Sequence, residues 1–125
     1  MRAVFLSASL DLWCVVDDED YEWAIRWKWN SKPRYSLRGW HWYAKRNAGA
    51  GRTPVYLHRE ICERAHGPAP AGKPLVDHID GNTLDCRRSN LRWASHAENR
   101  RNVGGVSRLI PIAENPPHRL EWAGF

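Results

Sequence analysis

Several common protein features are missing from this sequence. Among its 125 residues there are only three cysteines, Cys14, Cys62 and Cys86, which lie far apart and form no CxxC pair. This argues against a disulfide framework and against a structural zinc site, so we expect free thiols in a reducing cytoplasm. No apolar run approaches the roughly 20 residues that span a bilayer. The N-terminus also lacks the pattern of a signal peptide. We therefore expect a cytoplasmic protein with no membrane partner.

Acidic residues are absent from Trp23 through Arg59, although the whole chain has a net charge of only +5. The basic residues of this stretch are Arg26, Lys28, Lys32, Arg34, Arg38, Lys45, Arg46, Arg52 and Arg59. They alternate with tryptophan and tyrosine. A concentrated positive field of this kind neutralises phosphates and releases counterions. The pattern therefore favours a nucleic-acid partner over a simple solvated basic surface.

The length suits one compact domain or two very small ones. We divide the chain into three parts. Residues 1–54 are expected to form a basic and aromatic α+β subdomain that binds DNA. Residues 55–103 are expected to carry the chemistry, and residues 104–125 to form an extended tail, because that end has several prolines and few apolar anchors.

The pattern of residues 1–54 predicts short strands around one short helix. Two apolar runs near the N-terminus predict a strand pair, and Asp17 is the expected N-cap of a helix that reaches about Trp27. Strands are then expected on either side of a turn at Ser31-Lys32-Pro33, with Asn47 to Gly51 as a flexible loop. In this sheet one aromatic face is expected to be buried, because an aromatic stripe is more often core than a DNA-stacking surface.

Residues 55–103 predict a regular order of elements. We expect a helix from about Leu57 to His66, stopped by Gly67-Pro68. A strand leading to Asp77-His78 follows, then a turn at Asp80-Gly81-Asn82 and a return strand. Ser95 and Glu98 have the spacing of a capping box, which starts a helix near His96 that runs to about Asn102. The expected fold is therefore α+β: a small antiparallel aromatic-rich sheet with short helices, followed by a ββα unit.

This ββα unit contains the parts needed for phosphodiester hydrolysis. His78 is a suitable general base near neutral pH. Asp77 and Asn99 offer hard oxygen ligands for a divalent cation, Mg²⁺ or Mn²⁺ rather than zinc. Asn90 either holds the loop or holds the His78 ring by a hydrogen bond. Taken one at a time, each of these residues also fits a turn or a helix surface.

At the level of motifs, the sequence resembles the HNH endonucleases of phages and phage introns, in particular the homing-endonuclease-like branch with a His-Asn-Asn motif. The residues that carry this resemblance are Leu57-His58-Arg59, His66-Gly67-Pro68, Val76 to Asn82, Arg87, Asn90-Leu91-Arg92 and Glu98-Asn99. The joined spacing of His78, Asn90 and Asn99 is far more specific than an isolated Asp-His pair. The resemblance implies a ββα-metal fold and a phage origin.

The resemblance also implies a role for each matched residue. His78 would be the general base, Asp77 and Asn99 the metal ligands, and Asn90 the residue that braces the hairpin and the histidine. Two departures are visible. Asp85-Cys86 stands where the branch commonly has two asparagines, and no C-terminal DNA-binding module is recognisable.

Further residues are candidates for contact with DNA. The expected phosphate contacts are Arg59, Arg87, Arg88, Arg92, Arg100, Lys45 and Arg46. His58 and His96 are second-tier site residues, since a histidine on a helix is more often structural or at the surface. Phosphate contacts of this kind position the protein rather than read the base sequence.

The sequence thus predicts an enzyme, a divalent-metal-dependent endonuclease that nicks or cleaves double-stranded DNA. It would act as a monomer or homodimer and need no small-molecule cofactor. Two alternatives stay open. One is a non-catalytic DNA-binding module built on a degenerate HNH scaffold, and the other is an RNA-directed nuclease. The target sequence and the biological role, whether homing, packaging or breakdown of host DNA, are not encoded in any motif that we find.

Overall fold

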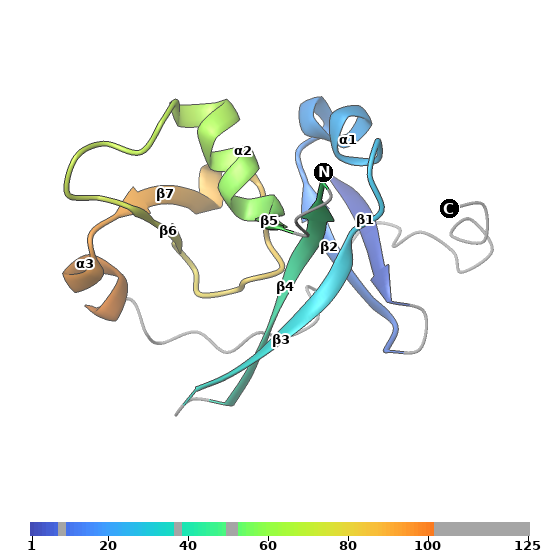
Figure 1. Cartoon of the computed structure of the whole chain (residues 1–125), viewed down its shortest axis with the longest axis horizontal. Coiled ribbons are helices and arrows are strands. Elements are labelled where there is room, and N and C mark those ends of the chain that lie inside the picture. The colour runs from blue at the N-terminus through green and yellow to red at the C-terminus, as the bar shows by residue number, and fades with distance from the viewer. Residues whose placement is uncertain (8–9, 37–38, 50–52, 102–125) are drawn as a thin grey trace.

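The computed structural model of the chain describes residues 1–7, 10–36, 39–49 and 53–101. The predicted extended tail at 104–125 lies outside these described residues, as does Asn102, the expected last residue of the final helix. The described part combines three small antiparallel sheets with short helices (Figure 1). The expected α+β class is therefore confirmed.

The N-terminal strand pair forms as expected. β1 (Arg2–Ser7) pairs with β2 (Leu12–Val16), and α1 (Asp18–Ala24) follows. Asp17 occupies the N-cap position, but its side chain does not cap the helix. Its Oδ2 instead accepts a hydrogen bond of 2.8 Å from the backbone N–H of Arg88. The expected helix to Trp27 was also too long, because α1 ends at Ala24.

The second sheet has the strand order β3-β4-β5, with β3 (Asn30–Ser36), β4 (Gly39–Ala48) and β5 (Thr53–Tyr56). The turn predicted at Ser31-Lys32-Pro33 was wrong, because these residues lie inside β3 and pair with β4. Pro33 is tolerated there because β3 is an edge strand and lacks a second neighbour that would need its missing N–H. Similarly, β4 continues through the first two residues of the loop expected at 47–51.

The helix predicted at Leu57 to His66 is observed with these bounds as α2 (Leu57–His66). It ends at Gly67, whose φ of 77° lies in the left-handed region that glycine adopts without strain. β6 (Leu75–His78) then pairs with β7 (Leu91–Ala94) after a short 3₁₀ turn, η1 (Arg88–Asn90).

The final helix, α3 (His96–Arg101), begins at the predicted capping box. The backbone N–H of Glu98 donates to Ser95 Oγ over 3.1 Å, and the N–H of Ser95 donates to Glu98 Oε1 over 3.0 Å. Each side chain therefore satisfies a backbone donor of the first turn, which would otherwise lack a partner inside the helix. The helix packs against both strands of the β6–β7 hairpin.

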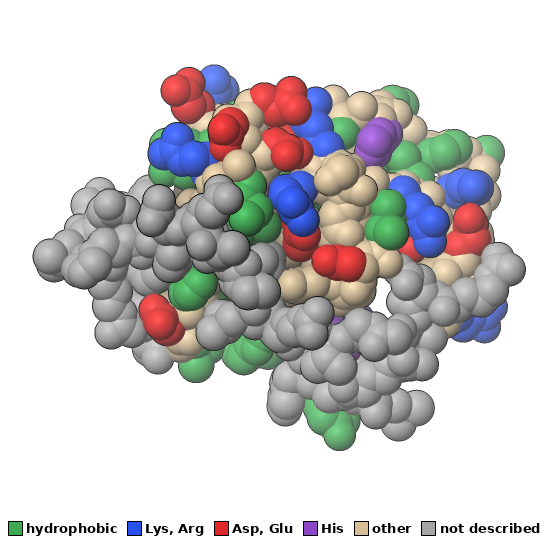
Figure 2. Space-filling model, turned by 180° about the vertical axis from the view of Figure 1, so that it is seen from behind, with side chains coloured by type: hydrophobic (Ala, Val, Ile, Leu, Met, Phe, Trp, Pro, Cys, Tyr) green, Lys and Arg blue, Asp and Glu red, His purple; other side chains and the backbone are tan. Residues whose placement is uncertain are grey.

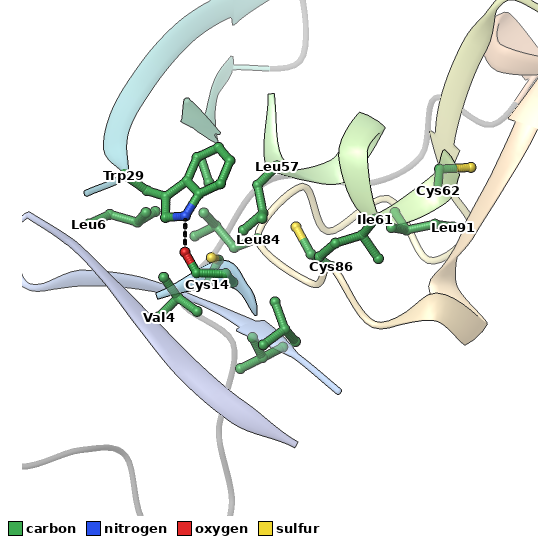
Figure 3. Packing of buried hydrophobic residues seen from close by; sticks show 14 of the residues in the cluster. Val4, Leu6, Cys14, Trp29, Leu57, Ile61, Cys62, Leu84, Cys86 and Leu91 are labelled. Carbon is green, nitrogen blue, oxygen red and sulfur yellow. Dashed lines mark hydrogen bonds between the residues drawn. The ribbon is translucent and has the colours of Figure 1, made fainter. Parts of the chain in front are cut away.

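One hydrophobic core joins the parts on either side of residue 54. Trp29 from the N-terminal part is 2% exposed and packs in the same cluster as Leu57, Ile61 and Leu84 (Figure 3). Its indole Nε1 donates a hydrogen bond of 2.8 Å to the carbonyl oxygen of Ala24. Trp29 and Trp27 lie just before β3, outside the sheet, and both pack in or against the cluster. Within the sheet, Trp42 packs against the cluster but Tyr35 is 70% exposed, so the expected burial of one aromatic face holds for only part of the sheet.

Backbone hydrogen bonds join the same two parts. The N–H of Val15 in β2 donates to Leu84 O, and the N–H of Cys86 donates to Val15 O, each over 2.9 Å. The bridge between Val15 and Asp85 is parallel. The segment between β6 and β7 is therefore anchored on the N-terminal hairpin. The three cysteines are free thiols, and all three are buried.

Candidate active site

The loop after β6 is held in one conformation by Asn90. Its Oδ1 accepts the backbone N–H of Asp80 over 3.0 Å, and its Nδ2 donates to Asp80 Oδ1 over 2.9 Å and to Asp85 O over 3.0 Å. Gly81, with a φ of 79°, supplies the left-handed turn position. The side chain of Asn90 thus links both ends of the loop. Of the two roles considered for it, these contacts correspond to holding the loop.

Asp77 lies opposite Arg92 across the β6–β7 hairpin and is almost fully buried, with 3% of its side-chain surface exposed. Nε of Arg92 donates to Asp77 Oδ2 over 2.9 Å, and Nη2 lies 2.8 Å from the same oxygen. Arg92 itself is half-exposed. The carboxylate is therefore oriented by a charge-assisted hydrogen-bonded pair, which is stronger than a neutral one.

His78 follows Asp77 in β6, so the two side chains point to opposite faces of the hairpin. The ring of His78 is buried and enters a cluster of aromatic side chains from other elements. Its centroid is 5.1 Å from that of His58 in α2 and 6.1 Å from that of Tyr43 in β4. Tyr56 completes the cluster, 5.5 Å from His58 and 6.3 Å from Tyr43. We call these four residues the ring cluster.

The environment of the ring cluster changes the protonation of its members. Burial, assisted by electrostatic interactions with the neighbouring His78 and Arg59, holds the pKa of His58 well below 6.5. Burial raises the pKa of Tyr43 above 10. Near neutral pH, His58 is therefore an uncharged imidazole and Tyr43 a protonated phenol, and both are able to donate a hydrogen bond to an anionic oxygen.

A thiol also contacts His78. Cys86 shares hydrogen bonds with Cys14 and with His78, and the first of these, together with burial, raises the pKa of Cys86 well above 9. The thiol is therefore protonated at neutral pH. Cys86 stands at one of the positions where the sequence departs from the pattern of the HNH branch, and its burial at 1% exposure agrees with a structural role there.

The fourth predicted residue of the site, Asn99, lies in α3 and is partly buried. Its helix packs against β6, the strand that carries Asp77. The structure therefore shows a direct side-chain contact between His78 and His58. For Asp77 and Asn99 it shows only that the strand and the helix that carry them pack against each other. The described residues contain no group of three or more His, Cys, Asp or Glu side chains that could hold a metal. The proposed pair of Asp77 and Asn99 has only one side chain of these four types, so it would not form such a group.

Most of the arginines expected at DNA are engaged within the fold. Arg87 is paired with Asp85 and Arg88 with Asp20, each at 2.7 Å. Figure 2 shows the result on one face of the molecule, where Lys and Arg side chains lie beside Asp and Glu. The remaining contacts are those of Arg59 with Pro74 O and the Trp93 ring, Arg46 with the Trp27 and Trp29 rings and Glu60, and Arg92 with Asp77.

Two of the residues expected at DNA, Lys45 and Arg100, form no ion pair with any residue in the described ranges. Of the second-tier histidines, His58 joins the ring cluster, and His96 is exposed at the start of α3. DNA contact by these side chains stays a prediction.

Sequence reasoning missed Tyr43 and Cys86 as neighbours of the candidate base, and Tyr56 as a neighbour of Tyr43 and His58. For Tyr43 a signal was present, because the alternation of β4 places it on the face opposite Trp42. That alternation separates the faces of the strand, but it does not show that one of them meets β6. No comparable signal marks Cys86.

Comparison with known proteins finds sequence matches for one part of the chain. The family model of HNH endonucleases matches residues 55–101, less than half of the chain. A curated relative, Protein 3.8 of Escherichia phage T7, is 46% identical over 46 residues, which cover 37% of this chain and 37% of the relative. The chain therefore aligns with little more than a third of that relative. No solved structure matches the chain.

The matched segment begins in β5 and ends with α3, and it includes Asp77, His78, Asn90 and Asn99. It leaves out β4 and with it Tyr43. The family resemblance expected from the sequence is thus confirmed over this segment, because residues 55–101 match the family model of HNH endonucleases.

Proposed function

We propose that the chain is a divalent-metal-dependent endonuclease that hydrolyses phosphodiester bonds of double-stranded DNA, with His78 as the general base. The observation that carries the proposal is the position of His78, at the end of β6 inside the segment that matches the HNH family and beside two donors, His58 and Tyr43. A base, neutral hydrogen-bond donors and a separate carboxylate within one small region are the groups that phosphodiester hydrolysis requires.

In the proposed reaction a water molecule gives its proton to an imidazole nitrogen of His78 as its oxygen attacks phosphorus. The new P–O bond forms as the bond to the leaving 3′-oxygen breaks, and that oxygen finally takes up a proton from solvent. Negative charge grows on the non-bridging oxygens during attack. Hydrogen bonds from His58 and Tyr43 stabilise that charge, because both groups are neutral donors in a partly buried site.

The donor set fits a hard divalent cation. Asp77 would supply a carboxylate oxygen and Asn99 an amide oxygen, as Mg²⁺ or Mn²⁺ prefers, and the fit is supported by the packing of α3 against β6. A cation bound there would supply charge stabilisation at the phosphate and at the leaving oxygen. Arg92 orients the carboxylate of Asp77. Asn90 acts through the loop that it holds and is a positioning residue.

The wider setting is part of the same proposal. The net charge of +5 favours a polyanionic substrate, and the T7 relative favours a phage-infected bacterial cell as the setting. Each chain carries one candidate base, so a monomer would nick one strand and a homodimer would be needed to cut both. Membership of the homing branch rests on the His78, Asn90 and Asn99 motif.

The test is cleavage of a supercoiled plasmid in Mg²⁺ or Mn²⁺, with an EDTA control and the variant His78→Ala. We expect nicked or linear product that disappears with EDTA and falls by about 100-fold or more in His78→Ala, because a general base contributes about 10²–10⁴-fold. DNA binding and the circular dichroism spectrum should be retained.

The alternatives predict other results. A wild-type chain that binds DNA but never cleaves it would identify a binding module. Cleavage of RNA in preference to DNA would identify an RNA-directed nuclease, and undiminished cleavage by His78→Ala would exclude the mechanism.

A further inference from the structure

The two strands of the β3–β4 ribbon have different faces. In an antiparallel pair, residues directly opposite each other share a face, and successive residues alternate between faces. Asn30 is opposite Lys45, Lys32 is opposite Tyr43, and Arg34 is opposite His41. These six residues therefore lie on one side of the ribbon, which we call the polar face.

The other face of the ribbon belongs to the fold. Ser31 is opposite Ala44, which is 1% exposed in the core. Pro33 is opposite Trp42, which packs against the same core. Arg46, two residues beyond Ala44, lies over the ring of Trp27 at 4.3 Å. The protein itself therefore covers part of this face, at Ala44, Trp42 and Arg46, whereas Lys32 and Arg34 on the polar face are exposed.

The polar face is continuous with the candidate active site. Tyr43 belongs to it and also contacts His58 and His78, with ring centroids at 5.4 Å and 6.1 Å. Arg34 lies close enough for its charge to lower the pKa of Tyr43, against the larger effect of burial. In Figure 1 the β3–β4 ribbon extends away from the region where β5, α2 and β6 meet. The basic residues of the face thus lead outward from His78.

The charges of the polar face are also unengaged. Lys32 and Arg34 are exposed, and neither forms an ion pair with any residue of the described part. Arg87, Arg88 and Arg92, by contrast, are paired with carboxylates. An unpaired guanidinium or ammonium group binds phosphate without first breaking an internal ion pair.

We infer that the polar face of β3–β4 binds the phosphate backbone of duplex DNA next to the bond that His78 hydrolyses. This inference rests on the proposed function for the identity of the substrate. Lys32 and Arg34 are two residues apart, which is about 7 Å along a strand and corresponds to about two base-pair rises of the duplex. They would therefore contact neighbouring backbone positions on one side of the cleaved bond.

The test measures DNA binding in EDTA, so that no cleavage is required. The double variant Lys32→Ala, Arg34→Ala removes two positive charges from the polar face. The variant Arg26→Glu, at an exposed position between α1 and β3, changes the net charge by the same amount and is the matched control. Affinity for a short duplex is measured at several salt concentrations for each protein.

In the double variant, the slope of log affinity against log salt should become shallower by about 2, because each lost phosphate contact removes roughly 0.9 from it. Arg26→Glu should change the slope by less than about 0.5. Equal effects of the two proteins would overturn the inference, because they would show that net charge alone matters.

The inference and the proposed function fail in different ways. Suppose that the wild-type chain never cleaves DNA, but loses affinity for DNA only when the polar face is changed. That result would support the polar face as the DNA-binding surface and would exclude the proposed endonuclease function. If the wild-type chain cleaves DNA and the double variant binds DNA with unchanged affinity, the inference about the polar face is wrong but the proposed function stands. Tighter binding to a duplex RNA of the same length than to DNA would overturn the assignment of the partner.

Discussion

Arg92 and Asp77 form an ion pair across the β6–β7 hairpin, with two nitrogens of the guanidinium within 2.9 Å of one carboxylate oxygen. The pair explains how a carboxylate with 3% of its side chain exposed is held in the fold. It also means that a residue expected at the DNA backbone, Arg92, is in contact with the proposed metal ligand. Two variants separate these roles.

Asp77→Asn removes the charge of the proposed ligand and keeps the shape of the side chain. We expect cleavage to fall by at least about 100-fold, since even changes behind the ligands of metal sites cost about 10- to 100-fold. The metal concentration that gives half-maximal cleavage should rise. Both quantities are measured by plasmid nicking in a Mn²⁺ titration.

Arg92→Gln is the control for Asp77→Asn, because it breaks the same ion pair but keeps the carboxylate. If the two variants lose activity equally, with no change in the metal dependence, then Asp77 acts through the ion pair and the assignment as ligand is wrong.

Tyr43→Phe tests the phenol that contacts His78. The ring contacts are kept and one hydroxyl donor is lost, so we expect the single-turnover rate to fall by about 100-fold, as on removal of one donor to a developing oxyanion. DNA affinity should change little. The matched control is Tyr56→Phe, which removes a hydroxyl from the same cluster at a ring with no described contact to His78. Equal rates for both variants and the wild type would limit Tyr43 to packing.

Asn90→Ala tests whether this residue braces the loop. The change removes the hydrogen bonds to Asp80 and Asp85 and leaves buried groups without partners, so the free energy of unfolding should decrease by about 2 kcal/mol. Urea denaturation measures the effect, with Asn30→Ala as an exposed asparagine for comparison. Loss of cleavage with unchanged stability would instead indicate a direct part in catalysis.

Asp20 predicts how stability depends on pH. It is fully buried, and burial alone would raise its pKa, but hydrogen bonds from Arg88 and Arg64 lower the pKa below 3.8. The unfolded chain therefore binds this proton more readily than the folded chain. The resulting stability is present above pH 3.8 and is lost as the pH falls through the lower pKa of the folded protein.

Asp20→Asn should reduce the free energy of unfolding at pH 7 by about 2 kcal/mol, since one partner of a buried ion pair is removed while the arginines stay partly hydrated. It should also flatten the decrease in stability below pH 3.8. Urea unfolding of both proteins between pH 7 and pH 2.5 measures this. A wild-type curve with the same acid limb as the variant would contradict the assignment.

Local sequence determined the elements that carry the site. The capping box at Ser95 and Glu98, the turn at Gly81 and the helix end at Gly67 each depend on residues within a few positions, so they were correctly predicted. The family match over residues 55–101 has the same basis, because its motif lies in one short stretch. The turn predicted at Pro33 was wrong because pairing with β4, a tertiary context, overrode the local preference.

Only the tertiary structure decided which side chains surround the motif. Tyr43 reaches His78, and Asp20 reaches Arg88, across long separations in sequence. The sequence located the basic residues but not their partners. Only the packing showed that carboxylates pair with Arg87, Arg88 and Arg92, whereas Lys32 and Arg34 are exposed. The physical reason is that a helix cap or a turn is stabilised by neighbours along the chain, whereas an ion pair or a ring contact depends on how separate elements pack.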